Sequence, residues 1–322
     1  MNFQQLEYVL AVEVHLHFAK AADQCHVTQP TLSMMIQKLE EEIGVKIFDR
    51  SRQPVAPTQA GEALIAQARV VLREAARLRE IARAEETSLS GELRIGIIPT
   101  LSPYLLPLFL QSFMEKHPDI RLKISERTTS ALVDALHKSL LDAAILVTPL
   151  HENTLREEPL FYEAFVVYSG RDYDKEFLLP EDIDPNHLWL LEEGHCFRSQ
   201  IMNICELRRK DRLSVEYEAG SLETLKQLVD AQNGITILPE LATRYLTEAQ
   251  LRKVKRFAAP QPVREVSLVT HRHLVKRRLV ETLKNEILRH LPQGILNQEN
   301  AASRTPVIPN NQRSAAGSQE RL

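Results

Sequence analysis

The chain contains little cysteine, little tryptophan and no long apolar run. Its 322 residues include three cysteines and one tryptophan. Three unevenly spaced cysteines are too few for the disulfide framework of a secreted domain. No segment is apolar over the roughly 20 residues that a membrane helix needs, and Met1–Leu10 has neither the basic nor the apolar part of a signal peptide. We therefore expect a soluble, cytoplasmic protein in which any disulfide is transient.

The chain also lacks an excess of positive charge. It has 40 Lys and Arg against 43 Asp and Glu, which gives a net charge of -3. This balance excludes a uniformly basic nucleic-acid coat, so DNA binding would require a small, locally arranged surface. The length, with 43% hydrophobic and 26% charged residues, predicts a globular protein of two or three domains.

Residues 1–58 have the pattern of three short helices followed by a β-wing. Helical spacing covers Leu6–Leu10, Phe18–Gln24 and Thr28–Glu42. A strand at Val45–Phe48 and a Pro-marked turn follow. The first domain is therefore predicted to be a winged helix-turn-helix.

The third of these helices has a clear start and a clear buried face. Thr28 is placed to cap it, with Pro30 in its first turn. Leu32, Ile36 and Leu39 recur on one side and predict a buried stripe. The opposite side is then free to enter a major groove.

The exposed side of this helix carries polar groups that suit DNA. Residues near its N-terminus are placed for phosphate, outward residues could reach base edges, and two wing arginines would add phosphate contacts. The predicted DNA-binding residues are Thr28, Gln29, Pro30, Thr31, Ser33, Met34, Gln37, Lys38, Arg50 and Arg52. The alternative is a three-helix packing module with no DNA role, which the acidic run Glu40–Glu42 supports.

Residues 59–88 are predicted to form a dimerisation linker helix. It starts after Thr58, a candidate N-cap, and continues to about Glu86 without proline. Apolar residues alternate four and three apart and form a narrow, Ala-rich seam that suits a partner helix. The seam residues are Leu64, Ala68, Val71, Ala75, Leu78 and Ala82. The alternative is a helix docked on its own domain.

Residues 89–292 alternate between strand and helix patterns, which predicts an α/β domain with a parallel sheet. The predicted strands are Leu93–Ile98, Ile120–Ser125, Ala143–Val147, Leu188–Leu191, Leu213–Tyr217 and Ile235–Leu238. The predicted helices are Pro103–Lys116, Ser130–Leu140 and Leu222–Ala231. We expect two lobes, about 89–162 with 265–292 and about 163–264, and a ligand site in the cleft between them. The tail, 293–322, has no periodic apolar face and is predicted to be disordered.

Two of the three cysteines form a candidate redox pair. Cys196 is predicted to open a helix, where the helix N-terminus, His195 and Arg198 would lower its pKa and favour the nucleophilic thiolate. Oxidation by a peroxide would give a sulfenic acid, which Cys205 could trap as a disulfide. The two cysteines are nine positions apart. On an intact helix their Cα atoms would be about 13 Å apart, whereas a disulfide needs roughly 7 Å or less. Pairing therefore requires the intervening helix to unwind or shift.

Other roles for the cysteines remain open from the residues alone. Cys25 has no charged neighbour in sequence and is expected to be a packing residue. Cys205, which lies between Ile204 and Leu207 with one residue intervening, could equally be buried. His195 with the two thiols offers zinc ligands, but no Cys-x-x-Cys pair or fourth ligand is evident. We predict no metal and no cofactor.

The first sixty residues resemble the N-terminal domain of LysR-type transcriptional regulators. The segments that carry this resemblance are Leu6, Ala21–Asp23, Val27–Ser33, Lys38–Glu40, Ile43–Gly44 and Thr58–Gly61. The resemblance implies a winged helix-turn-helix, a dimerising linker helix and an effector domain similar to periplasmic binding proteins. It also implies a homodimer or homotetramer on double-stranded promoter DNA.

The rest of the chain resembles the peroxide-responsive members of that family. The matching segments are Ile98–Thr100, Pro103–Pro107, Thr129, Leu141–Asp142, Gly194–Cys196 with Arg198 and Cys205, Ser221–Leu225 and Gly234–Pro239. The resemblance implies that Cys196 is the peroxidatic thiol and Cys205 the resolving thiol. It places Thr100, Thr129, His195 and Arg198 in a pocket for hydrogen peroxide, although each threonine precedes a predicted helix and could instead cap it.

The resemblance also implies a function, which has two alternatives. The oxidised form would alter promoter contacts and recruit RNA polymerase, and a thiol reductant would reset it. The expected protein is a regulator and not an enzyme. The alternatives are a regulator that binds a small organic effector between the lobes, and a thiol peroxidase that uses the same cysteine chemistry. A solute-binding protein is not expected, because no signal peptide is seen.

Overall fold

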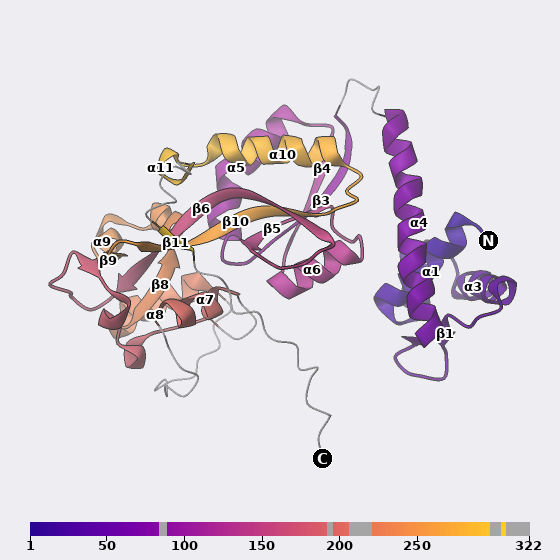
Figure 1. Ribbon diagram of the computed structural model, residues 1–322, viewed down its shortest axis with the longest axis horizontal. Helices are drawn as coiled ribbons and strands as arrows, with labels where there is room; N and C mark the ends of the chain where they lie inside the picture. Colours follow the sequence, from indigo (N-terminus) through magenta and orange to yellow (C-terminus); the bar gives the residue numbers. More distant parts are fainter. Residues whose placement is uncertain (84–88, 192–195, 206–220, 297–303, 307–322) are drawn as a thin grey trace, which may run out of the picture. The chain divides into compact units, whose positions relative to one another are not determined.

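The computed structural model describes residues 1–83, 89–191, 196–205, 221–296 and 304–306. The chain divides into two compact units, Met1–Ser88 and Leu89–Leu322 (Figure 1). In the part of the chain that is described, no helix combines the length and the apolar character required to cross a membrane.

The first unit is a helical module with a small wing and one long helix. Its elements are α1 (Phe3–His15), α2 (Phe18–Gln24), α3 (Gln29–Ile43), β1 (Phe48–Asp49), β2 (Ala56–Pro57) and α4 (Gln59–Arg83). Thr28 caps α3 by accepting a hydrogen bond from the Thr31 amide, and a proline occupies the first turn. Leu32, Ile36 and Leu39 are buried in the core. The predicted start and buried stripe of this helix are confirmed.

The wing is held to α3 by a buried carboxylate. Glu40 lies in α3, is 2% exposed, and accepts hydrogen bonds from the Ile47 and Phe48 amides at 2.8 and 3.3 Å. Its other oxygen faces Lys46 at 3.3 Å and Arg50 at 3.5 Å. Part of the acidic run that seemed to oppose DNA binding is therefore neutralised inside the domain.

The wing strands differ from the predicted one. The structure pairs Phe48 with Pro57 and Asp49 with Ala56, so the strand predicted at Val45–Phe48 begins at Phe48. The residues just before Phe48 do not join the strand, because Lys46 and Ile47 already donate hydrogen bonds to Glu40.

The junction between the wing and α4 requires a glycine. A Cβ at Gly61 would lie 2.0 Å from the Ile47 carbonyl oxygen. Thr58 closes the same corner, because its hydroxyl donates to the Lys46 carbonyl at 2.6 Å and accepts from the Gly61 amide at 2.9 Å. The predicted capping role of Thr58 is confirmed.

The long helix α4 is described as far as Arg83, and its predicted end at about Glu86 lies outside the described residues. The structure divides its predicted seam. Leu64, Ala68 and Val71 pack on the core of the first unit, and Ala68 is only 4% exposed. This half of the helix is docked on its own domain through Ala68, while Leu64 and Val71 keep part of their surface exposed, and the predicted contact of these residues with a partner helix stays a prediction.

The remaining seam residues lie further along α4. Ala75 is partly buried, Leu78 is 71% exposed, and the side chain of Ala82 lies outside the described part. The docked half is also tied to α1 by an ion pair between Arg69 and Glu13 at 2.5 Å. Leu78 is therefore the most exposed residue of the predicted seam among those whose side chains are described.

The second unit is built on a mixed sheet. Its strands are β3 (Gly91–Ile97), β4 (Ile120–Glu126), β5 (Ala143–Thr148), β6 (Leu155–Ser169), β7 (Phe177–Leu178), β8 (Ile235–Pro239), β9 (Val254–Phe257), β10 (Gln261–His271) and β11 (Arg304–Pro306). They run in the order β4-β3-β5-β10-β6-β9-β7, with β8 paired to β6 and β11 to β10. β3 is parallel to β4 and β5, but β10 is antiparallel to β5 and β6. The predicted parallel pairing is confirmed for β3, β4 and β5, but the sheet as a whole is mixed, because β10 returns from the second lobe in the opposite direction.

Helices cover this sheet in both lobes. They are α5 (Ser102–Lys116), α6 (Thr129–His137), α7 (Cys196–Ile204), α8 (Leu222–Gln232), α9 (Glu248–Leu251), α10 (Arg277–His290) and α11 (Gln293–Leu296), with short 3-10 turns η1 (Pro180–Asp182), η2 (Pro185–His187) and η3 (Glu240–Tyr245). β6 and β10 are the long strands that cross from one lobe to the other (Figure 1). β5 is buried along its whole length, which its sequence AAILVT predicts for a strand covered on both faces.

Three segments of the second unit differ from their predicted structure or lie outside the described residues. The tail predicted to be disordered contains α11 and β11, and β11 pairs in parallel with β10 at Gln261–Val263. For those short segments the prediction was wrong, and the other tail residues lie outside the described part. The strand predicted at Leu213–Tyr217 also lies outside it. Leu188 makes only an isolated bridge with Ile235, instead of opening the strand predicted there.

Buried ion pairs join the helices of the first lobe to the sheet and to one another. Asp142 accepts from the Arg94 amide at 2.8 Å and from Lys276 at 2.9 Å, which anchors the start of α10. Glu286 of α10 accepts from Ser112 and Lys116 of α5, both at 2.6 Å. Burial alone would raise the pKa of Glu286, but these two donors overcome it and lower the pKa to about 2.

Glu286→Gln should therefore destabilise the second unit in a pH-dependent manner. The folded-state pKa lies below the ordinary value of about 4.3, so the carboxylate contributes stability above that value and loses it as pH falls towards 2. We expect a loss of about 1–3 kcal/mol at pH 7, shrinking below pH 4. Urea unfolding followed by the fluorescence of Trp189, the only tryptophan, measures it.

Glu281→Gln is the matched control, because its exposed carboxylate pairs only with Lys284 at 3.3 Å. It should cost less than about 1 kcal/mol. An equal loss for both variants, or a loss from Glu286→Gln that does not vary with pH, would contradict the role of the buried network.

Candidate functional site

The two candidate redox cysteines mark the ends of one short helix. Cys196 is the first residue of α7, and the Cys205 amide donates to the Ile201 carbonyl at 3.0 Å just past its end. Both thiols are free. Phe197 and Ile201 are fully buried and fix the helix to the core. The expectation that an intact helix separates the two sulfur atoms is confirmed.

A buried ion pair lies beside the first turn of this helix. Arg264 of β10 donates from Nε to the Glu163 carboxylate at 2.8 Å, and its Nη2 lies 2.7 Å from the same oxygen. Nη1 donates to the Thr100 hydroxyl at 2.9 Å, and Nη2 to the Thr100 carbonyl at 3.2 Å. The guanidinium also lies over the Phe197 ring, 5.3 Å from its centre. These contacts place a cation next to Cys196 and away from solvent.

The surroundings of Cys196 act on its thiol in opposite directions. Burial raises the pKa of the thiol, and this is the dominant effect. A hydrogen bond with Thr129, the charge of Arg264 and the amides of Phe197 and Cys196 lower it, but they do not overcome burial. The sequence predicted a lowered pKa, so among the described residues the net direction is the reverse. Desolvation of a sulfur in an apolar wall explains the difference.

The second thiol is even less disposed to ionise. Burial raises the pKa of Cys205 to about 12. The described residues offer it no opposing charge that lowers this value. Cys205 is therefore a packed, protonated thiol while α7 is intact.

The two threonines of the predicted pocket do not cap their helices. The N-cap of α5 is Leu101, and Thr100 instead accepts from Arg264. The N-cap of α6 is Thr128. The Thr129 hydroxyl is buried and has no nitrogen or oxygen partner among the described residues, so it is left to the Cys196 sulfur. A buried hydroxyl whose one neighbour is a sulfur keeps capacity to bind a small polar molecule.

The other two predicted pocket residues are placed differently. Arg198 donates to the Leu191 carbonyl at 2.9 Å and so joins the first turn of α7 to Leu191. His195 lies outside the described residues. Cys25 packs against the core of the first unit, where burial and then the charge of Glu7 raise its pKa.

Sequence reasoning missed Arg264 and Glu163. A usable signal was present, because Glu163 is the single charged residue in the segment LFYEAFVVY, and Arg264 lies with Glu265 in the largely apolar segment PVREVSLV. Charged residues are almost never fully buried unless they are paired. What the sequence could not supply was the pairing of two residues 101 positions apart.

The predicted DNA-binding residues gather on one side of α3 and on the wing. Thr28, Gln29, Pro30, Thr31, Met34, Gln37, Lys38 and Arg52 are exposed, and Ser33 is partly buried. Arg50 is committed within the domain, because it donates to Ser33 at 2.9 Å and lies 4.8 Å from the centre of the Phe18 ring. Arg52 pairs with Asp49 at 3.1 Å and is otherwise free to reach outward.

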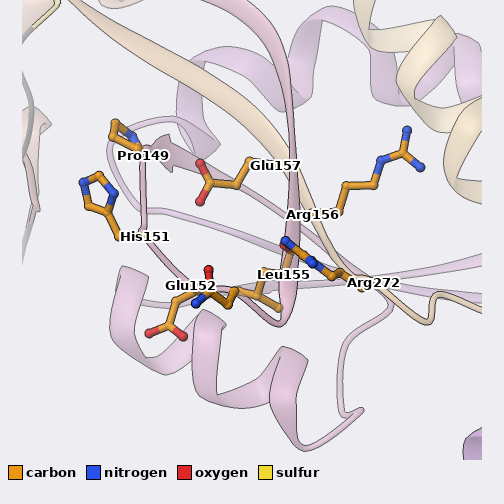
Figure 2. A pocket seen from close by; sticks show the side chains of 8 residues that line it. Pro149, His151, Glu152, Leu155, Arg156, Glu157 and Arg272 are labelled. Carbon is orange, nitrogen blue, oxygen red and sulfur yellow. The ribbon is translucent and has the colours of Figure 1, made fainter.

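A separate hollow of about 560 Å³ lies far along the chain from these residues. Figure 2 shows it beside the loop after β5, with His151, Glu152, Glu157 and Arg272 at its rim. Its walls come from the first lobe alone, so it is not the cleft between lobes that the sequence predicted. None of its lining residues contacts Arg264 or Cys196 in the described structure.

Comparison with known proteins defines the class of this chain. Residues 3–62 match the bacterial regulatory helix-turn-helix protein model of the lysR family, and residues 86–292 match the LysR substrate binding domain. With a DNA-binding module and a regulatory domain of that type, the protein is a helix-turn-helix regulator with a ligand- or signal-sensing domain. The chain belongs to the LysR family.

Several of its relatives have related names. A hydrogen peroxide-inducible genes activator from Dickeya chrysanthemi is 37% identical over 297 residues, which cover 90% of this chain and 96% of the relative. The DNA-binding transcriptional dual regulator OxyR of Escherichia coli K12 is 41% identical over 245 residues, 75% of this chain and 80% of the relative.

Solved structures similar to this chain include proteins with the same name. A full-length cysteine-to-aspartate variant of OxyR from Pseudomonas aeruginosa has a TM-score of 0.76 and 34% identity, covering 90% of this chain and 99% of that one. A cysteine-to-serine variant of Corynebacterium glutamicum OxyR with hydrogen peroxide bound has a TM-score of 0.58 and 29% identity, covering 90% and 92%.

The Thr129 hydroxyl should set part of the reactivity of Cys196. Thr129→Val removes a hydrogen bond that lowers the thiol pKa, so alkylation of Cys196 should slow at pH 7 and its pH profile should move to higher pH. Mass spectrometry of the iodoacetamide-treated, reduced protein measures the rate at each pH. Thr128→Val, one residue earlier and without a side-chain cap bond, should leave the profile in place. Equal profiles for the two variants would show that Thr129 does not act on the sulfur.

Proposed function

We propose that this protein is a DNA-binding transcription regulator that senses hydrogen peroxide through Cys196. The observation that carries the proposal is the grouping of one thiol with the buried Thr129 hydroxyl and a fixed guanidinium at the start of a helix that is followed by a second thiol. The names of the relatives support it, as does the peroxide-bound state of one similar structure.

The pocket residues suit a peroxide. In the proposed step the Cys196 thiolate attacks one oxygen of hydrogen peroxide, so that an S–O bond forms and the O–O bond breaks. The sulfur is oxidised by two electrons to a sulfenic acid, and the departing hydroxide takes up a proton to become water. Thr129 and Thr100 can orient the oxygens, and Arg264 can stabilise the departing charge.

The second step requires the helix to open. The Cys205 thiolate attacks the sulfenic sulfur, an S–S bond forms, and hydroxide leaves and is protonated to water. With a pKa of about 12, Cys205 is protonated in the packed helix. Because release from the core would both expose this thiol and shorten the gap to Cys196, we infer that unwinding of α7 and ionisation of Cys205 occur together.

The switch would act on DNA through the assembly of the protein. An oxidised α7 has a different surface, which would change how subunits pair and therefore how two helix-turn-helix modules meet promoter DNA. RNA polymerase would be recruited by this state in the cytoplasm, and a thiol reductant would supply two electrons and two protons to restore both thiols. No resident cofactor is required by these steps.

Substitution of each cysteine tests the redox switch. Cys196→Ser should abolish both the disulfide and the change of DNA footprint after brief exposure to micromolar peroxide, because the attacking thiolate is lost. Cys205→Ser should still form a sulfenic acid at Cys196, trapped by dimedone, but no intramolecular disulfide. Thiol mapping by mass spectrometry and footprinting of the same samples measure both.

Cys25→Ser is the control and should respond as the wild type, since Cys25 is a packing residue of the first unit. A footprint response that survives in Cys196→Ser would favour an organic effector instead. Sustained peroxide consumption with a thiol reductant, unaffected by removing residues 1–60, would favour a thiol peroxidase.

The α3 surface predicts two different DNA phenotypes. Lys38→Ala should weaken promoter and unrelated DNA alike and reduce the slope of log affinity against log salt by about 1, because one phosphate contact is lost. Gln37→Ala should weaken promoter DNA by about 1–3 kcal/mol with little change in the salt slope, because a base contact is lost. Fluorescence anisotropy over a salt series measures both effects.

Lys123→Ala removes one positive charge from β4 in the second unit and is the control for net charge. It should leave the salt slope unchanged. A loss of slope equal to that of Lys38→Ala would mean that the effect is a property of net charge and not of the α3 surface.

A further inference from the structure

We propose that Glu163 is a positioning residue for the redox site, which holds Arg264 in the orientation that acts on Cys196. This inference rests on the proposed function, because it concerns the reactivity of the same thiol. It assigns a role to a residue that neither touches Cys196 nor lies near it in sequence.

Each oxygen of the Glu163 carboxylate accepts a hydrogen bond from a different residue. Oε2 accepts from Arg264 at 2.8 Å, and Oε1 accepts from the Leu241 amide at 2.8 Å. The side chain is completely buried, so water cannot replace either partner. A glutamine cannot satisfy both donors, because one of its two terminal atoms is itself a donor.

Arg264 depends on this carboxylate for its position. The guanidinium is 1% exposed, and besides the carboxylate it donates to the hydroxyl and the carbonyl of Thr100. Neither Thr100 oxygen carries a full charge, so Glu163 is the only anion in contact with the cation among the residues described. An arginine without that anion would lose the partner that holds its orientation and would be strongly driven to reach water.

The pair also connects the two lobes. Glu163 and Arg264 lie on β6 and β10 where these strands pass between lobes, opposite each other in the register. Thr100 follows β3 in the first lobe, whereas Leu241 belongs to η3 beside β8 in the second. The pair therefore links the lobes, because the carboxylate holds Arg264 to Leu241 of the second lobe while Arg264 itself donates to Thr100 of the first.

The sign of the effect separates positioning from simple electrostatics. Arg264 lowers the pKa of the thiol, and the other charged or titratable groups that act on the pair are Glu240 and Tyr104. If Glu163 acted only through its own negative charge, removing it would favour the thiolate and speed reaction of Cys196. If it positions Arg264, removing it should disfavour the thiolate and slow the reaction.

The test is alkylation of Cys196 by iodoacetamide in the reduced, full-length protein across a pH series. Glu163→Gln should lower the rate at pH 7 by about tenfold, the factor that corresponds to one pKa unit, and move the profile to higher pH. Arg264→Met should do the same. The double variant should react no more slowly than Arg264→Met alone, because the carboxylate acts through the guanidinium.

The double variant also keeps the test available if Glu163→Gln folds poorly, because it leaves no unpaired buried charge. A double variant slower than Arg264→Met would overturn the proposal, as would a faster reaction in Glu163→Gln. So would an unchanged profile in a Glu163→Gln protein that is merely less stable by Trp189 fluorescence.

Glu265→Gln is the matched control. It alters the neighbouring carboxylate of β10, which is held by Tyr162 at 2.6 Å and Thr148 at 2.5 Å and does not contact Arg264. It should leave the alkylation profile unchanged. Because alkylation needs neither peroxide nor DNA, a failure of the peroxide-sensing proposal would appear in the footprint alone, and a failure of the positioning proposal in the alkylation profile alone.

Discussion

The ion pair between Glu163 and Arg264 is the interaction on which the rest of the site depends. Two charges removed from water cost several kcal/mol each unless they are paired and fully hydrogen-bonded. Here both conditions hold, since Glu163 also accepts the Leu241 amide and Arg264 also donates to Thr100. The sheet makes this arrangement possible, because β6 and β10 bring residues 163 and 264 opposite each other at the crossing between lobes.

The first turn of α7 packs against this ion pair, and this contact affects the reactivity of Cys196. The Phe197 ring contacts the Arg264 guanidinium, and its centre lies 5.5 Å from the centre of the Phe165 ring. The start of the helix is therefore held by the same cation that lowers the pKa of the adjacent thiol. Burial still wins, and the thiol pKa is raised. Reactivity with a peroxide therefore requires local stabilisation of the thiolate at the moment of attack, not a thiolate that is present at all times.

Local sequence signals predicted local structure well and long-range pairing poorly. The start and the buried face of α3 were predicted correctly from Thr28, Pro30 and the stripe Leu32, Ile36 and Leu39, because caps and 3.6-residue periodicity act within a few residues. The Ala-rich pattern of α4 predicted a helix but not the surface against which its first half packs, since an alanine such as Ala68 fits a helix–helix seam or a domain core equally well. The direction of β10, the partner of Arg264 and the net pKa of Cys196 all depend on contacts made by residues far apart in the chain, and no window of sequence contains both members of those contacts.

The proposed switch then has a defined energetic problem. Joining Cys196 to Cys205 requires α7 to give up its hydrogen bonds and to move Phe197 or Ile201 from full burial, at about 1.5–3 kcal/mol for each side chain exposed. Under the proposed mechanism, the covalent change at the sulfur offsets that loss. Because Arg264 contacts the ring of Phe197 and also acts on the Cys196 thiol, the residue that assists oxidation is among those whose contacts oxidation must break. Under this mechanism, sensitivity to peroxide and stability of the reduced fold cannot be adjusted independently at Arg264.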